Sequence, residues 1–285
     1  MDLIVTALRI EAEPWLNRLE LIKHNSSGKL ELFLNAEQQT AVLITGTGRI
    51  AMATALTQTL AIWPHLVSPD LPDVVINFGL AGFIDTDGTP PKRGTLRLIH
   101  RIDEQATGRS FYPDRLVQTD IPESALTTHD QIVTHQTPGA QGWVDMEASA
   151  FFQAARRFLP THHFHCLKLL SDYGSKRLDV GEVRSLVSTA FEPVEAYRAQ
   201  ARKIAPPCPN PLQNSHLQWI ELAAHTLRLT QSQSSQLREA VHGALLRNAD
   251  AVAKRLAQPI KALSSSQPSA RNARCARLLD EFHNL

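Results

Sequence analysis

The sequence predicts a domain of the α/β class followed by a helical extension. Short apolar runs, typical of buried strands, alternate with longer segments in which apolar residues recur at helical spacing. Four of the six residues in 206–211 are prolines, and beyond them residues 216–263 contain helical patterns without a strand-like run. We therefore expect an α/β domain over residues 1–205 and a helical C-terminal extension over residues 206–285.

The first apolar run, residues 3–8, predicts a buried strand. Glu11 follows it in a segment that suits the start of a helix, so this acid lies just beyond the carboxyl end of a strand. Residues 30–35 and 41–45 predict two more strands. The second leads into a glycine-containing turn and then into a helix whose apolar face is formed by Met52, Ala53, Leu56, Leu60 and Trp63.

Residues 73–78 form another buried-strand pattern, which leads into a glycine-containing segment at residues 79–83. Glycine at such a place allows the backbone to approach a ligand closely. Residues 95–101 predict a further strand. The stretch from 116 to 141 gives no clear pattern apart from a short element near residues 128–133.

Two segments place acids where one structural element ends. Within residues 142–150, Glu147 precedes a helix whose apolar residues repeat at helical spacing. Residues 166–174 form a buried-strand pattern that ends in Ser171 and Asp172, and ligands of α/β proteins usually bind outside the carboxyl ends of strands. Two acids placed in this way predict a functional site.

Composition limits the partners of the chain. It has 285 residues, of which 43% are hydrophobic, and this is enough to bury a full core. Its 29 basic and 28 acidic residues leave a formal charge of +1, so we expect neither nucleic acid nor a membrane as a partner. The sequence contains no run of about 18 apolar residues and no signal-peptide pattern, and we expect a cytoplasmic protein.

Four motifs occur together: IVTALRIEAE at residues 4–13, ITGTGRIAMATAL at 44–56, VVINFGLAGF at 74–83, and VDMEASA at 144–150 followed by LLSDYG at 169–174. In this order they resemble the nucleoside phosphorylase and nucleosidase superfamily, and they are most similar to its 5′-methylthioadenosine/S-adenosylhomocysteine nucleosidases. The resemblance covers residues 1–205. It implies a three-layer, phosphorylase-like domain with a central mixed sheet flanked by helices, a nucleoside substrate, a homodimer, and no metal or organic cofactor.

The resemblance also implies a role for each acid. Asp172, with Ser171 beside it, would donate a proton to the leaving purine, and Glu11 would orient or deprotonate the attacking water. Glu147 would accept hydrogen bonds from the ribose hydroxyls, and Met146 would pack against the sugar. Further residues that would line the substrate pocket are Gly48, Ile50, Ala81, Gly82, Ile132 and Val133.

Carboxyl groups suit the chemistry of an N-glycosidic bond. The bond breaks through an oxocarbenium-like sugar, so the reaction is helped by protonation of the base, stabilisation of the sugar cation and delivery of water. Phosphorolysis would instead require cations around a phosphate, and Glu11 stands where the phosphorylases typically offer an arginine. Arg9 and Arg49 lie near the two loops and keep phosphorolysis open as an alternative.

The same residues also have structural interpretations. Glu147 could interact only with the dipole of the following helix, and Asp172 could only cap a turn. The cluster of His162, His163 and His165 has no nearby carboxylate at ligand spacing, so it does not indicate a metal site.

Three positions depart from the residues of the family. Leu80, Ile132 and Lys168 replace a small polar residue, an aromatic residue and an arginine, and they leave the identity of the base and of the 5′ group open. These changes, together with the helical extension, motivate a second hypothesis. In it, the chain binds a nucleoside without turnover and its extension binds a partner.

Overall fold

The computed structural model describes residues 1–24, 29–68, 70–84, 88–174, 179–204, 212–260 and 268–285. The chain divides into two compact units, Met1–Cys208 and Pro209–Leu285. The boundary expected between residues 205 and 206 falls within 205–211, outside the described residues. Each unit has a hydrophobic core of its own.

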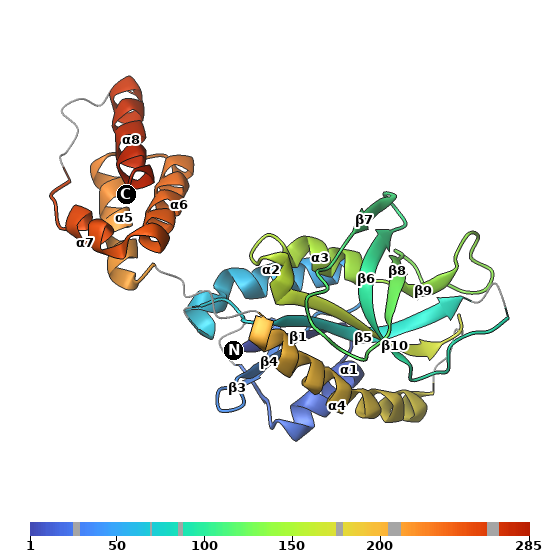
Figure 1. Cartoon of the computed structure of the whole chain (residues 1–285). Coiled ribbons are helices and arrows are strands. Elements are labelled where there is room, and N and C mark those ends of the chain that lie inside the picture. Colours follow the sequence, from blue (N-terminus) through green and yellow to red (C-terminus); the bar gives the residue numbers. More distant parts are fainter. Residues whose placement is uncertain (25–28, 69, 85–87, 175–178, 205–211, 261–267) are drawn as a thin grey trace. The chain divides into compact units, whose positions relative to one another are not determined.

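A mixed β-sheet forms the centre of the first unit (Figure 1). Its strands are β1 (Asp2–Thr6), β2 (Ile22–Lys23), β3 (Glu31–Asn35), β4 (Thr40–Ile44), β5 (Val75–Ile84), β6 (Leu96–Glu104), β7 (Arg109–Phe111), β8 (Glu123–Thr128), β9 (Gly142–Asp145) and β10 (Phe164–Asp172). β1 pairs in parallel with β4 and β5, and β10 pairs in parallel with β5. The carboxyl ends of β1, β4 and β10 therefore open on the same edge of the sheet.

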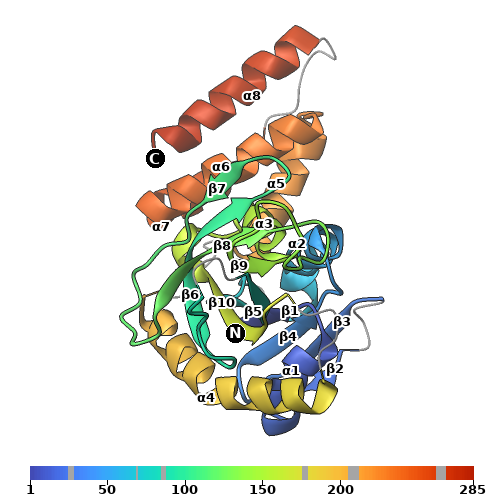
Figure 2. The same ribbon diagram turned by 90° about the vertical axis from the view of Figure 1, so that its right-hand side faces the viewer.

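Four helices cover the two faces of this sheet, which gives the three layers implied by the resemblance. They are α1 (Arg9–Arg18), α2 (Arg49–Leu66), α3 (Ala148–Ala155) and α4 (Val180–Ile204). Figure 2 shows α2 and α3 on one side of the sheet and α1 and α4 on the other. The predicted α/β class with a central mixed sheet is confirmed.

The alternation of side chains between the two faces of each strand explains why helices cover both faces of the sheet. Leu3 and Val5 of β1 lie in the core that contains Trp63 of α2, whereas Ile4 lies in the core that contains Trp15 of α1. Because successive side chains of a strand point to opposite faces, a strand with apolar residues at successive positions must be covered on both sides.

One strand prediction differs from the structure. β5 does not stop before the glycines at 79–83 but continues to Ile84, because its backbone pairs with β10 on one side and with β9 near its end. Near residues 128–133, where the sequence indicates a short element without specifying its type, β8 ends at Thr128. The helix α4 contains 25 residues, and Pro193 lies within it.

The second unit is helical, as predicted for the extension. It contains α5 (Asn214–Thr226), α6 (Gln231–Arg247), α7 (Ala249–Leu256) and α8 (Pro268–His283). Apolar side chains from all four helices pack together around Leu237, Val241, Val252 and Phe282. Within the described residues, no helix has the length and apolar character needed to cross a membrane.

Candidate active site

A cavity of about 350 Å³ lies where β1, β4 and β10 end. Its lining consists of Ala7, Leu8, Glu11, Thr47, Leu80, Ala81, Gly82, Ile132, Val133, Val144, Asp145, Met146, Glu147, Ser171 and Asp172. The structure thus brings together the predicted acids with Met146, Ser171, Ala81, Gly82, Ile132 and Val133. Segments that are more than one hundred residues apart in sequence meet here because parallel strands deliver them to one edge.

Two predicted residues do not belong to this lining. The side chain of Ile50 is 82% exposed. Gly48 acts through its backbone, since its N–H donates to Oε1 of Glu147 over 2.7 Å. The φ angle of Gly48 is +91°, a conformation that glycine adopts far more readily than other residues.

Glu11 is buried at the start of α1 and its carboxylate is held by the backbone. The N–H groups of Ala7 and Leu8 donate to Oε2 over 2.9 and 2.8 Å, and the N–H of Leu80 donates to Oε1 over 2.8 Å. Burial raises the pKa of Glu11, although these bonds and the charge of Lys168 oppose the shift. A carboxylate can accept about four hydrogen bonds, and described residues supply three of those of Glu11.

Glu147 lies between β9 and α3, at the element boundary that the sequence predicted. Burial and the negative charge of Asp145 raise its pKa to about 7, against the opposing effects of Lys168 and the Gly48 N–H. Glu147 therefore titrates near neutral pH.

Asp145 and Lys168 form a buried ion pair beside the cavity, with Nζ 2.9 Å from Oδ2. Asp145 also accepts hydrogen bonds from the Thr128 hydroxyl at 2.7 Å and from the Ala148 N–H at 2.8 Å. All of these contacts hold the turn that carries Glu147. The sequence offered one signal for this pair, because a lysine inside a buried-strand pattern requires a partner of opposite charge.

Asp172 is the last residue of β10 and belongs to the cavity lining. The hydroxyl of Ser171 donates to Oδ2 over 2.7 Å, and the N–H of Gly174 donates to Oδ1 over 2.8 Å. Gly82 pairs with Asp172 across β5 and β10, so the small residue leaves space in front of the carboxyl group.

The cavity is strongly acidic. Glu11, Asp145, Glu147 and Asp172 belong to its lining, and its described lining contains no lysine or arginine. Lys168 lies behind this surface and compensates part of the charge. Such a cavity favours a neutral or positively charged ligand over an anion.

Arg9 and Arg49, the two arginines considered as phosphate ligands, contact other side chains. The guanidinium of Arg9 lies 5.3 Å from the centre of the Phe33 ring. Arg49 binds Glu104 and Asp130. Neither arginine lines the cavity.

The histidine cluster has structural contacts. Nδ1 of His163 lies 2.7 Å from the Asp73 carbonyl oxygen, and Nδ1 of His165 lies 3.0 Å from the Tyr197 hydroxyl. No group of three or more potential metal ligands occurs among the described residues.

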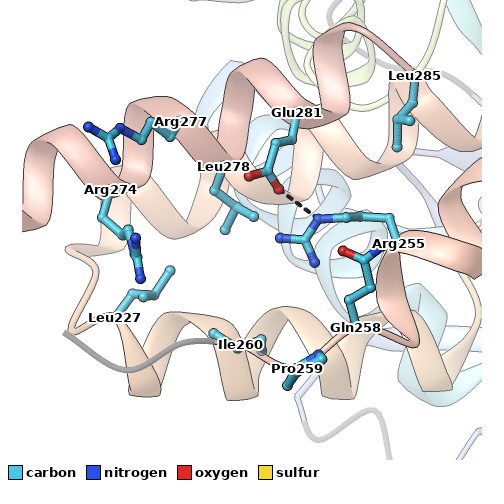
Figure 3. Close-up of a pocket in the computed structure, with 10 residues that line it drawn as sticks. All are labelled: Leu227, Arg255, Gln258, Pro259, Ile260, Arg274, Arg277, Leu278, Glu281 and Leu285. Atoms are coloured by element: carbon cyan, nitrogen blue, oxygen red, sulfur yellow. Dashed lines mark hydrogen bonds and ion pairs between the residues drawn. The ribbon is translucent and has the colours of Figure 1, made fainter.

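The helical unit has a separate cavity of about 540 Å³ (Figure 3). Figure 3 shows Arg255 of α7 reaching Glu281 of α8, and their side chains are 2.6 Å apart. Glu281 is the only acidic side chain in the described lining of this cavity, and it is already paired. The cavity therefore lacks the several carboxyl groups that acid and base chemistry at a glycosidic bond requires.

Comparison with solved structures shows that the chain shares its fold with 5′-methylthioadenosine nucleosidases and with a futalosine hydrolase. The resemblance found in the sequence is thus confirmed at the level of the fold. No protein-family model matches the chain, and no curated protein matches its sequence.

The similar structures include two nucleosidases and a futalosine hydrolase. The 5′-methylthioadenosine nucleosidase of Arabidopsis thaliana is 15% identical with a TM-score of 0.52, and the match covers 72% of this chain and 95% of that one. The 5′-methylthioadenosine/S-adenosylhomocysteine nucleosidase of Helicobacter pylori is 14% identical with a TM-score of 0.53, covering 70% and 98%. A mutant futalosine hydrolase of Helicobacter pylori is 11% identical with a TM-score of 0.55, covering 69% and 97%.

Proposed function

We propose that the chain is a nucleosidase that hydrolyses the N-glycosidic bond of a purine nucleoside, including one with a 5′ substituent. The observation that carries the proposal is the meeting of Glu11, Glu147 and Asp172 in one cavity whose described lining has no lysine or arginine. Similar structures include nucleosidases and a futalosine hydrolase, which supports the reaction class.

Each acid has a role consistent with its surroundings. Asp172 supplies the proton to the departing base, and the Ser171 hydroxyl orients its carboxyl group. Glu147 accepts hydrogen bonds from the ribose hydroxyls. Glu11, whose pKa is raised, takes the proton of a water molecule that attacks the anomeric carbon. The water oxygen thus bonds to the sugar as the bond to the base breaks.

Hydrolysis is favoured over phosphorolysis by the charges around the cavity. A phosphate would face four acidic side chains at close range, of which Asp145 is paired with Lys168, and would find no lysine or arginine in the described lining. Water carries no charge and meets no such repulsion.

The test is a panel of methylthioadenosine, adenosylhomocysteine, futalosine and adenosine, incubated with the full chain with and without phosphate. We expect free base in the absence of phosphate, detected by chromatography. Base release that requires phosphate and yields a sugar phosphate would identify a phosphorylase instead. Tight binding by calorimetry without release of base would identify the nucleoside-binding protein of the second hypothesis.

We also propose a homodimer. Ile132 in the cavity lining is 71% exposed and Ile50 is 82% exposed, so both can be covered by a second subunit. Light scattering after size-exclusion chromatography measures the mass in solution, and a monomer at micromolar concentration would contradict the proposal.

A further inference from the structure

Arg49 joins two loops on the rim of the candidate active site. It is the first residue of α2 and follows Gly48, the glycine whose N–H binds Glu147. Its Nε and Nη2 lie 2.6 and 3.0 Å from the two carboxylate oxygens of Asp130, which is the bidentate geometry that guanidinium groups form with carboxylates.

Asp130 stands in the loop that carries part of the cavity wall. Ile132 and Val133, two and three residues further on, belong to the lining. The pair between Arg49 and Asp130 therefore connects the turn that contacts Glu147 to the loop that contributes Ile132 and Val133 to the cavity lining.

A third contact ties Arg49 to the interior. Its Nη1 lies 2.5 Å from Oε1 of Glu104, a buried residue at the end of β6. The side chains of Ser149 and Gln153 on α3 donate to the same oxygen over 3.2 and 2.9 Å. Because α3 begins directly after Glu147, this carboxylate links Arg49 to the helix that positions the sugar-binding acid.

Glu104 keeps the negative charge that its contact with Arg49 requires. Burial alone would raise its pKa, but hydrogen bonds from Thr107, Arg49, Gln153 and Arg109 lower it to about 2. The carboxylate is thus ionised throughout the neutral range and remains paired with Arg49.

We propose that Arg49 is a positioning residue that holds the Gly48 turn and the 130–133 loop in register around the nucleoside, and not a phosphate ligand. All three of its nitrogens bind carboxylates, so its charge is compensated. This inference rests on the proposed function for its kinetic consequences, but its structural content can be tested separately.

The kinetic test compares Arg49→Met, Arg49→Lys and Asp130→Asn in the full chain. We expect Asp130→Asn to raise KM about threefold to fivefold, since a partly exposed ion pair contributes at most about a factor of five. Arg49→Met should raise KM about tenfold or more, because this variant also loses the ion pair with Glu104. Arg49→Lys should recover only part of this loss, since an ammonium group cannot bind both oxygens of Asp130 in a planar fork.

The matched control is Arg109→Met. Arg109 also donates to Glu104, over 3.1 Å, but it lies on β7, and its side-chain partners among the described residues are Glu104, Thr107 and the Phe111 ring. We expect an unchanged KM in this variant. Equal effects of Arg109→Met and Arg49→Met on KM, or lower melting temperatures with unchanged KM in the Arg49 and Asp130 variants, would overturn the positioning role.

Hydrogen–deuterium exchange tests the linkage without reference to turnover. Arg49→Met should accelerate amide exchange in residues 46–48 and 129–133 more than Arg109→Met does. Unchanged exchange in both segments would overturn the inference even if the wild type is an active nucleosidase. Conversely, accelerated exchange in a chain that neither binds nor cleaves nucleosides would support the link that Arg49 makes between the two segments. The same result would contradict the proposed function.

Discussion

Nζ of Lys168 lies 2.9 Å from Oδ2 of Asp145, and both side chains are buried, with Asp145 in the cavity lining and Lys168 outside it. The pair connects β10, which ends in Asp172, with β9, which leads to Glu147. A single ion pair therefore couples the positions of two acids that the proposed reaction requires.

We predict that Lys168→Met lowers the free energy of unfolding by about 3–5 kcal/mol, since removal of one partner leaves a buried charge without compensation. Urea denaturation measures this loss. The control Lys203→Met removes an exposed lysine of α4 and should change the free energy of unfolding by less than about 0.5 kcal/mol. A Lys168→Met variant as stable as the control would show that the pair contributes nothing to stability.

Replacing the proposed general acid should separate turnover from binding. We predict that Asp172→Asn lowers kcat about 10² to 10⁴-fold while KM changes little, because proton donation acts mainly in the transition state. Release of base from methylthioadenosine in steady state measures both constants. Asp120→Asn, at an exposed position outside the cavity lining, is the control. Full turnover in Asp172→Asn would exclude Asp172 as the acid.

The pKa of Glu147, about 7, predicts an acidic limb in the pH profile of kcat/KM. Below this pH the carboxyl group is protonated and loses acceptor capacity for the ribose hydroxyls, so kcat/KM should fall up to about tenfold per pH unit. Measurements between about pH 5 and 9 would reveal the limb. A profile that stays flat across pH 7 would contradict this role.

The raised pKa of Glu147 also affects the stability of the fold. Ionisation of Glu147 favours catalysis but lowers stability. The pKa of Glu147 is higher in the folded state than its ordinary value of 4.5, so the folded state holds more protons and loses stability as pH rises from 4.5 to about 7. Glu147→Gln imitates the protonated form. We predict that it is more stable than the wild type by about 1–3 kcal/mol near pH 8 but not near pH 4.

Thermal and urea denaturation at both pH values measure this difference. Glu37→Gln, at an exposed site between β3 and β4, is the control and should show no such pH dependence. Equal stability of Glu147→Gln and wild type at pH 8 would mean that the ionised glutamate is not destabilised by its surroundings.

Gly79 is predicted to be intolerant of a side chain. A methyl group there would lie 3.2 Å from Nζ of Lys168 and 3.3 Å from Oε1 of Glu11, and both groups are buried and paired. We expect Gly79→Ala to destabilise the fold by about 1–3 kcal/mol and to reduce kcat. Gly243→Ala in α6 is the control, and it should leave kcat unchanged. An active and stable Gly79→Ala variant would show that this packing is not needed.

Part of the site was predictable because it depends on local pattern. Apolar runs identified β1 and β10, and the positions of Glu11 and Asp172 beyond or at their ends followed directly. The start of a helix after Glu147 was visible in the spacing of its apolar residues. These features need only the neighbouring residues in the chain.

Other features depend on pairing between distant strands. The sequence suggested that β5 would end before its glycines, but β9 and β10 supply hydrogen-bonding partners that extend it to Ile84. Similarly, the sequence left open that Arg49 binds a phosphate, whereas in the fold its guanidinium group binds Glu104 and Asp130. Local propensity cannot reveal such partners.

The sequence by itself determined the fold class, the helical extension and which acids stand at the ends of elements, because hydrophobic periodicity and boundary residues act over a few positions. Only the tertiary structure decided that Glu11, Glu147 and Asp172 share one cavity, and that Lys168 pairs with Asp145 behind it. Burial then raised the pKa of Glu147, since the desolvation of a charge depends on everything packed around it.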